Sequence, residues 1–245
     1  DLRMSRGLGD VYKRQVYDHP DEVIDMSIQE LAKAVAFSSA TILRFCKKLN
    51  FSGFAEFKFA LKQQNKEIAN LKKPISSMDS ITSLYDDIES TSLLIKERYL
   101  KEIIDLIDSN KRIHLYGEGI SRIPVDYLEK LLFSIGRQNV YKYKSSRLAA
   151  HIASNANEDD ILIAISTSGN YPTTVKIVKL FNLNHATIIA ISPYTKNAIA
   201  DLANINFRFF VNHRENIDTE YTSRLAIFYI IDVIFKTYLV RKEKE

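Results

Sequence analysis

Residues 161–175 have the sequence ILIAISTSGNYPTTV, and this stretch decides the fold of the larger part of the chain. A continuous apolar run, typical of a buried strand, leads directly into the loop 166–170, and a helix is expected to begin near Pro172. Backbone N–H groups and the dipole at a helix N-terminus favour negative charge, and short hydroxyl groups can donate to phosphate oxygens. The stretch therefore predicts a binding site for a small phosphorylated ligand.

Five apolar runs occur between residues 112 and 211, and their spacing leaves room for one helix between each pair. Runs rich in β-branched residues are buried on both faces, which is typical of a parallel sheet covered by helices. We therefore predict a doubly wound α/β domain of about five strands, with ligands bound at the carboxyl ends of the strands. The runs are RIHLY (112–116), VYKY (140–143), DILIAIS (160–166), ATIIAIS (186–192) and INFRFFV (205–211).

A second glycine-containing loop, GEGIS (117–121), follows the first of these runs. Its glycines let the backbone approach a ligand closely, and Ser121 offers a hydroxyl group. The loop lacks the third glycine and the downstream acid of a dinucleotide site and the lysine of a P-loop, so we expect no cofactor and no metal. Two such loops on odd-numbered strands of one sheet indicate an anion site. The alternative is two ordinary strand-to-helix turns with serine caps.

The segment from Ser27 to about residue 50 has the pattern of two short helices joined by a tight turn. Ser27 and Glu30 form a capping box, the first helix should stop around Ala36, and a second cap follows at Ser38. Such a helix-turn-helix places the N-terminal side chains of its second helix in the major groove of DNA. The candidate DNA contacts are Ser39, Ala40, Thr41, Arg44, Lys47 and Lys48, with Arg44 the best candidate for a bidentate contact to guanine.

The charge distribution supports a nucleic-acid partner for this part of the chain. Residues 27–73 carry nine basic and three acidic side chains, a net charge of +6, which leaves the remainder at −2. A basic unit joined to a mildly acidic one is typical of a DNA-binding module fused to another domain, although a merely solvated basic face gives the same count. The only cysteine, Cys46, is expected to be a small buried hydrophobe, which fits the cytoplasm.

Composition and periodicity also suggest boundaries along the chain. Residues 1–15 fit no pattern that follows, so we expect a non-native or disordered segment there. The helix-turn-helix domain is predicted at 16–70, a linker at 71–80, and the α/β domain at 81–245, led by one helix from about 81 to 109. The most apolar C-terminal run, 225–235, is too short to span a membrane and is interpreted as a buried helix.

These motifs resemble those of two known families. Residues 112–238 are similar to a SIS domain, the sugar isomerase fold that binds phosphosugars, and GxGxS with SxSG at odd strand ends carries the likeness. Residues 16–62 resemble the helix-turn-helix of the RpiR family of bacterial transcriptional regulators, most clearly in SSATILRFCKKL (38–49), and the order of domains matches too. The family has a glycine at the position of Ala36 and a first helix before Val16.

The resemblance implies which residues contact the ligand. Phosphate contacts are implied for Ser121, Ser166, Thr167 and Ser168, together with the loop glycines Gly119 and Gly169. Tyr171 stands where SIS loops commonly have a serine or threonine, so Thr173 or Thr174 becomes a candidate sugar contact, as does Glu118. SIS domains typically pair, which implies a homodimer or homotetramer.

Three functions are compatible with a SIS-like fold: an isomerase, a dimerisation domain and a transcriptional regulator. A sugar-phosphate isomerase needs a base and an acid, and spacing alone places no pair among the candidates Glu118, His151, Asp218 and Glu220. A SIS fold kept only for dimerisation would not need the serine set. A transcriptional regulator that binds operator DNA and senses a phosphorylated sugar accounts for both halves of the chain, and this is the function we expect.

Overall fold

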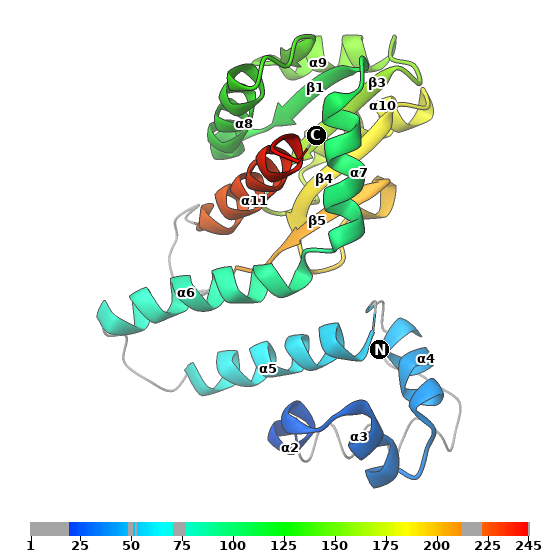
Figure 1. Cartoon of the computed structure of the whole chain (residues 1–245), viewed down its shortest axis with the longest axis vertical. Helices are drawn as coiled ribbons and strands as arrows, with labels where there is room; N and C mark the ends of the chain where they lie inside the picture. Colours follow the sequence, from blue (N-terminus) through cyan, green and yellow to red (C-terminus); the bar gives the residue numbers. More distant parts are fainter. Residues whose placement is uncertain (1–19, 49–50, 52, 71–76, 212–221, 245) are drawn as a thin grey trace. The chain divides into compact units, whose positions relative to one another are not determined.

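The structure is a computed structural model that describes residues 20–48, 51, 53–70, 77–211 and 222–244 (Figure 1). The chain divides into two compact units, Asp1–Ser76 and Ser77–Glu245. The segment predicted at 1–15 and the candidate acids Asp218 and Glu220 lie outside the described residues. Because each unit has its own core, the two units are described separately.

The described part of the N-terminal unit consists of α2 (Pro20–Asp25), α3 (Ile28–Ala34), α4 (Ser39–Lys48) and α5 (Phe54–Asn70). The predicted capping box is confirmed, since Ser27 Oγ accepts from Glu30 N at 3.2 Å and Glu30 Oε2 accepts from Ser27 N at 2.6 Å. Ser38 Oγ accepts from Thr41 N at 3.2 Å, so Ser38 caps the N-terminus of α4. The predicted helix-turn-helix is therefore present, and α5 closes a core of Val23, Leu31, Ala32, Val35, Ile42, Cys46, Phe54, Phe57 and Leu61.

Cys46 lies fully buried inside this core, as predicted. Burial raises the pKa of its thiol to about 11, so the reactive thiolate is scarce near neutral pH. The interpretation of Cys46 as a small hydrophobe is confirmed.

The turn between α3 and α4 depends on a left-handed residue at Ala36, whose φ is 54°. Phe37 N donates to Ala32 O at 2.9 Å and Ala36 N donates to Lys33 O at 3.3 Å, the hydrogen bonds of a Schellman motif. Glycine is usual at this position because a Cβ in the left-handed region costs roughly 1–2 kcal/mol. The turn thus forms with alanine, at a cost in conformational energy.

Replacing Ala36 by glycine should therefore stabilise the N-terminal unit. The strain relieved exceeds the extra backbone entropy that glycine loses on folding, so we expect the free energy of unfolding to rise by about 0.5–1 kcal/mol. Thermal unfolding of the two variants measures the difference. Lower stability in the Ala36→Gly variant would show that Ala36 carries no strain.

The second unit is built on a five-stranded parallel sheet in the order β2-β1-β3-β4-β5. The strands are β1 (Arg112–Gly117), β2 (Val140–Lys142), β3 (Asp160–Ile165), β4 (Thr187–Pro193) and β5 (Ile205–Phe209). Each corresponds to one of the five apolar runs of the sequence. The predicted doubly wound α/β fold is confirmed.

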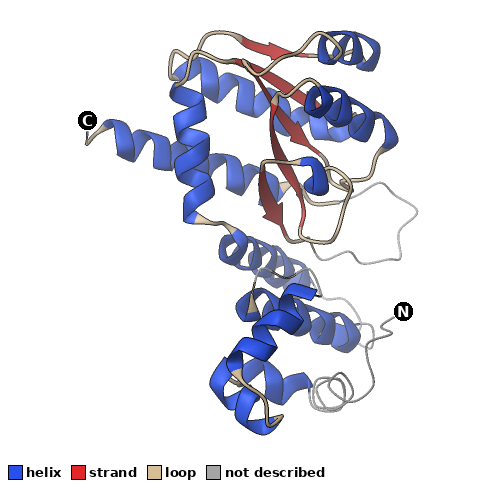
Figure 2. Ribbon diagram, turned by 90° about the vertical axis from the view of Figure 1, so that its right-hand side faces the viewer, coloured by secondary structure: helices blue, strands red, loops and turns tan. Residues whose placement is uncertain are grey.

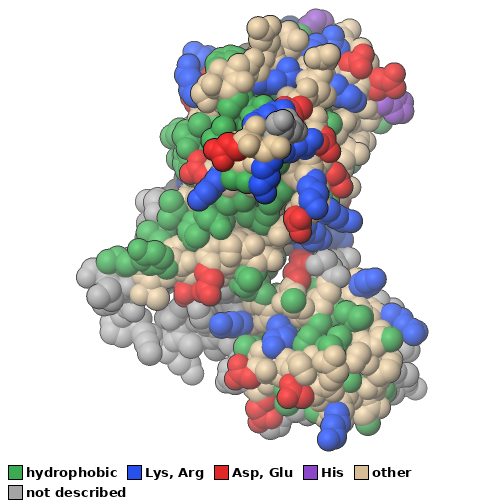
Figure 3. All heavy atoms as spheres, viewed as in Figure 1, with side chains coloured by type: hydrophobic (Ala, Val, Ile, Leu, Met, Phe, Trp, Pro, Cys, Tyr) green, Lys and Arg blue, Asp and Glu red, His purple; other side chains and the backbone are tan. Residues whose placement is uncertain are grey.

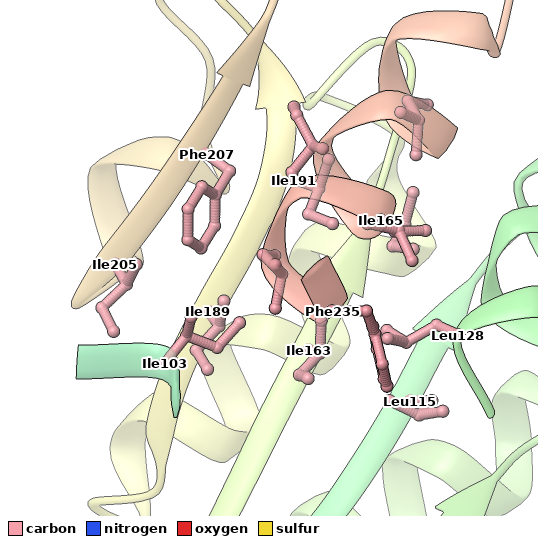
Figure 4. Packing of buried hydrophobic residues seen from close by; sticks show 14 of the residues in the cluster. Ile103, Leu115, Leu128, Ile163, Ile165, Ile189, Ile191, Ile205, Phe207 and Phe235 are labelled. Carbon is pink, nitrogen blue, oxygen red and sulfur yellow. The ribbon is translucent and has the colours of Figure 1, made fainter. Parts of the chain in front are cut away.

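Helices cover both faces of the sheet (Figure 2). Ile161, Ile163 and Ile165 of β3 pack with α7 (Glu97–Asp108), α8 (Arg122–Ser134) and α11 (Leu225–Lys242), and Figure 4 shows the centre of this cluster. Leu162 and Ala164 point to the other face, where α9 (Ser146–Ala153) and α10 (Pro172–Leu183) lie. Burial of both faces explains why the central strands β3 and β4 are almost continuously apolar, whereas the edge strand β2 is only partly buried and contains Lys142.

The leading helix differs from the prediction in two ways. Residues 77–80, assigned to a linker by sequence, begin α6 (Ser77–Leu94). The expected single helix also breaks before α7, where Lys96 is extended. The buried Thr91 accepts from Phe210 N at 3.0 Å and holds α6 beside the chain that follows β5. Helical periodicity alone does not detect such a tertiary contact.

Candidate ligand site and candidate DNA-binding helix

The two serine-containing loops meet at the carboxyl edge of the sheet. β1 and β3 are neighbours, with Gly117 opposite Ile165, so the loops that follow them lie side by side. The chain runs from β1 to β2 on one side and to β3 on the other, which makes this the topological switch point of the sheet. Doubly wound sheets bind their ligands at this point. The structure thus brings together the two loops that the sequence predicted to act jointly.

The loop after β3 is shaped by its own serines. Ser166 is buried, and its Oγ accepts a hydrogen bond from Gly169 N at 3.0 Å. Ser168 is exposed, and its Oγ accepts from Asn170 N at 3.2 Å. Pro172 is the first residue of α10, as predicted. The two serines thus differ in burial: Ser166 is buried and holds the loop through Gly169 N, whereas Ser168 is exposed at the edge of the sheet.

Residues that follow β4 form hydrogen bonds with the loop 166–170. Ile199 N donates to Gly169 O at 3.1 Å, and Ala198 N donates to Asn170 Oδ1 at 2.9 Å. Gly169 has a φ of 63°, and a Cβ at its position would lie 2.3 Å from the side chain of Asn197. The packing of Asn197 against the loop joins residues 28 positions apart, and no local sequence signal indicates it.

The loop after β1 also requires a close backbone approach. A Cβ on Gly117 would lie 2.7 Å from the carbonyl oxygen of Ser121 and 3.0 Å from Val125, so glycine is needed there. Gly119 has a φ of 56° and begins the short 3-10 helix η1 (Gly119–Ser121) that leads into α8. Ser121 is buried and its hydroxyl does not cap α8. These features keep Ser121 at the point where the two loops meet.

Glu118, a predicted sugar contact, is held by its neighbours. Its Oε1 accepts from Arg122 at 2.7 Å, and its Oε2 accepts from the hydroxyl of Tyr116. Burial and the adjacent Glu118 carboxylate raise the pKa of Tyr116, which keeps the phenol protonated as the donor. Both oxygens of Glu118 are thus already engaged, and this favours a role in positioning Arg122 and Tyr116 over one as a free base. The spacing of Glu118 and Arg122 on one turn is the only sequence signal for this cluster.

Two threonines near the start of α10, Thr173 and Thr174, were candidate sugar contacts, because Tyr171 stands where SIS loops commonly have a serine or threonine. Tyr171 is 50% exposed and forms no side-chain cap, so its phenol ring lies at the surface of the site. Thr174 is only 1% exposed, and its hydroxyl has no hydrogen-bond partner among the described residues. Thr173 is half-buried. Of the two threonines, Thr173 is therefore the one that a ligand could reach without movement of α10.

The remaining acid–base candidate, His151, does not join this site. It stands exposed in the last turn of α9, which runs back from the carboxyl edge of the sheet toward the amino edge. The buried His114 lies near the amino edge, where it contacts Asp160 at 2.8 Å and Tyr143 at 2.6 Å. Burial lowers the pKa of His114, and the pair ties β1 to β3. Neither histidine is placed to act on a ligand at the serine loops.

In the N-terminal unit, the candidate DNA contacts share α4. Arg44, Lys47 and Ala40 are exposed, Ser39 and Thr41 are half-buried, and Lys48 is the last residue of the helix. Ser38 acts as the cap that was predicted, and Phe45 packs edge-to-face on Phe57 with ring centroids 6.2 Å apart. No acidic residue occurs in α4. The helix therefore presents a cationic surface, as a major-groove helix requires.

Within the described ranges, no group of three or more His, Cys, Asp or Glu side chains could hold a metal ion. No helix in the part of the chain that the structure describes is both long enough and apolar enough to span a membrane.

Comparison with protein families gives two matches along the chain. Residues 15–67 match the helix-turn-helix domain of the rpiR family, and residues 105–236 match the SIS domain. The second match alone covers more than half of the chain.

Individual relatives match along nearly the whole chain. An uncharacterized HTH-type transcriptional regulator of Providencia stuartii is 26% identical over 97% of this chain and 88% of its own length. The HTH-type transcriptional regulator GlvR of Bacillus subtilis is 26% identical over 95% of this chain and 89% of its own. Among solved structures, the Vibrio vulnificus NanR protein complexed with ManNAc-6P has a TM-score of 0.62 at 22% identity, covering 98% of this chain and 89% of that one. At that identity the likeness shows a shared fold.

Proposed function

The chain belongs to the rpiR family of helix-turn-helix proteins with a SIS domain, and we propose that it is a transcriptional regulator controlled by a phosphorylated sugar. In this proposal α4 binds operator DNA, and the loops after β1 and β3 bind the phosphate group of the effector. Ser121, Ser166, Thr167 and Ser168 supply hydroxyl donors, Gly119 and Gly169 allow close backbone approach, and Thr173 contacts the sugar.

The observation that carries this proposal is the meeting of the two serine loops at the switch point of the sheet. The N-termini of α8 and α10 lie beside the same loops, and helix N-termini favour phosphate. The related fold of NanR was solved with a phosphorylated sugar, which supports the same class of ligand here.

Regulation requires that the sugar phosphate bind differently to the DNA-competent and DNA-incompetent arrangements of the protein. Only this difference in affinity can shift the equilibrium between the two arrangements. By thermodynamic linkage, operator DNA must then change the affinity for the sugar by the same factor. A ligand that binds both arrangements equally would leave operator affinity unchanged.

The same site does not favour an isomerase. Glu118 has both oxygens engaged, and His151 lies in the last turn of α9. Relatives named transcriptional regulators support the non-catalytic assignment.

A cytoplasmic location and a homodimeric or homotetrameric state belong to the proposal. Apolar side chains gather over α6 and α11 (Figure 3), and such patches favour self-association. The exposed large apolar residues of these two helices are Ile81, Leu84, Tyr85, Leu93, Leu225, Leu239 and Val240.

A thermal-shift screen across sugar phosphates tests the ligand site, and two serine variants make it specific. Ser168→Ala should abolish the shift caused by the effector while leaving the ligand-free melting temperature nearly unchanged, because the Ser168 side chain is exposed. Ser166→Ala, by contrast, should lower the stability of the ligand-free protein by about 1 kcal/mol, because it removes the buried hydrogen bond from Gly169 N.

Ser154→Ala is a suitable control, since it removes an exposed hydroxyl at the end of α9 in the same unit. An effector shift of normal size in Ser168→Ala would place the phosphate elsewhere.

A further inference from the structure

The exposed face of α4 contains an apolar side chain that the helix-turn-helix core does not use. Ile42 and Cys46 are buried in the core, at 1% and 0% exposure, and Phe45 packs on α5. Leu43 points away from them and is 39% exposed. Ala40, Leu43, Arg44 and Lys47 follow the spacing i, i+3, i+4 and i+7, so they form one continuous face of the helix.

We propose that Leu43 contacts the C5-methyl group of a thymine in the operator, beside the base that Arg44 contacts. This inference rests on the proposed function, because it takes α4 to be the helix that enters the major groove. The thymine methyl is the one apolar group that bases display in that groove, and apolar side chains on a recognition helix contact it. Leu43 and Arg44 would together specify a thymine close to a guanine.

The charge of the same face favours DNA over a protein as the partner of Leu43. Arg44, next to Leu43 in the sequence, and Lys47, one helical turn later, are both exposed, and no acidic residue occurs in α4. Two cations beside a single leucine add little to docking on another protein. In a DNA groove the same two cations lie close to phosphates, which attract them. Ala40, also exposed, is small enough to let the helix approach the base edges.

Replacement of thymine by uracil tests this contact, because uracil lacks only the methyl group. The operator is first selected from random DNA with the full chain, and each thymine is then replaced in turn. For the unmodified protein, one replacement should weaken binding about three- to tenfold, the amount expected for loss of one buried methyl contact. For Leu43→Ala, binding to the normal operator should fall by a similar factor, and the same replacement should have no further effect.

The control is Leu183→Ala, which removes an exposed leucine (72%) from α10 and should leave every operator unaffected. An unmodified protein that is indifferent to every uracil replacement would overturn the inference without any variant. So would a methyl effect that persists in Leu43→Ala, or a loss of self-association with unchanged DNA binding, which would assign Leu43 to a protein contact. If the chain selects no DNA sequence at all, it is the proposed function that fails.

Discussion

Replacing Gly169 by alanine is expected to abolish the binding of a sugar phosphate. The residue has a φ of 63°, and a Cβ there would lie 2.3 Å from Cγ and Oδ1 of Asn197. Asn197 cannot move aside easily, because it is 3% exposed and its Nδ2 donates to Thr195 O at 2.8 Å and Pro193 O at 3.1 Å. Its Oδ1 also accepts from Ala200 N at 3.0 Å. The loop that carries Ser168 must therefore shift.

The cost should appear in stability as well as in binding. The left-handed conformation contributes roughly 1–2 kcal/mol and the steric overlap roughly 1–3 kcal/mol, so the SIS domain should lose about 2–5 kcal/mol of unfolding free energy. Chemical denaturation measures this loss, and calorimetric titration with the effector measures the binding.

Gly136→Ala separates strain from crowding. Gly136 has a φ of 76°, lies between α8 and β2 away from the site, and has no atom within 4 Å of an added Cβ. This control should lose only the smaller, conformational part of the stability and should bind the effector normally. Normal effector binding by Gly169→Ala would contradict the assignment of the site to this loop.

Replacing Arg44 by lysine should remove sequence discrimination at one base pair of the operator while leaving the charge of α4 unchanged. Arginine can donate two parallel hydrogen bonds to guanine, and lysine cannot reproduce this fork. Discrimination at that position should therefore fall about tenfold or more, corresponding to roughly 1–3 kcal/mol. The dependence of affinity on salt should hardly change, since the number of cations is the same.

Lys47→Ala is the matched comparison, because Lys47 is exposed on the same face. It should weaken binding to all sequences about equally and reduce the slope of log affinity against log salt by about 1. Fluorescence anisotropy with single-position operator variants at several salt concentrations distinguishes the two effects. Full discrimination in Arg44→Lys would mean that another residue contacts the guanine.

Local signals in the sequence predicted much of this structure. The apolar runs predicted all five strands, and β1, β3 and β4 are buried along nearly their whole length because helices cover both faces of the sheet. The capping box of Ser27 and Glu30, the cap at Ser38 and the proline at 172 predicted where helices begin, because these signals act through neighbouring residues. Leu43 lies outside the buried positions Ile42 and Cys46 of α4, so its exposure follows from helical spacing.

Features that depend on contacts between distant segments could not be predicted. The hydrogen bond from Phe210 N to Thr91 joins α6 to the chain after β5, and the fit of Gly169 depends on Asn197. Glu118 accepts a hydrogen bond from the hydroxyl of Tyr116, which β1 places on the face of the sheet covered by α9 and α10. Sequence also treated Ser166 and Ser168 as equivalent, whereas burial and hydrogen bonding give them different roles.

Coupling between the two units is the central claim, and one titration tests it most directly. Affinity for the selected operator is measured at fixed salt, without ligand and with each of a panel of sugar phosphates. We predict that at least one sugar phosphate changes the operator dissociation constant about fivefold or more for the unmodified protein and leaves it unchanged for Ser168→Ala. Operator affinity that no sugar phosphate alters, or an effect that survives intact in Ser168→Ala, would contradict the account.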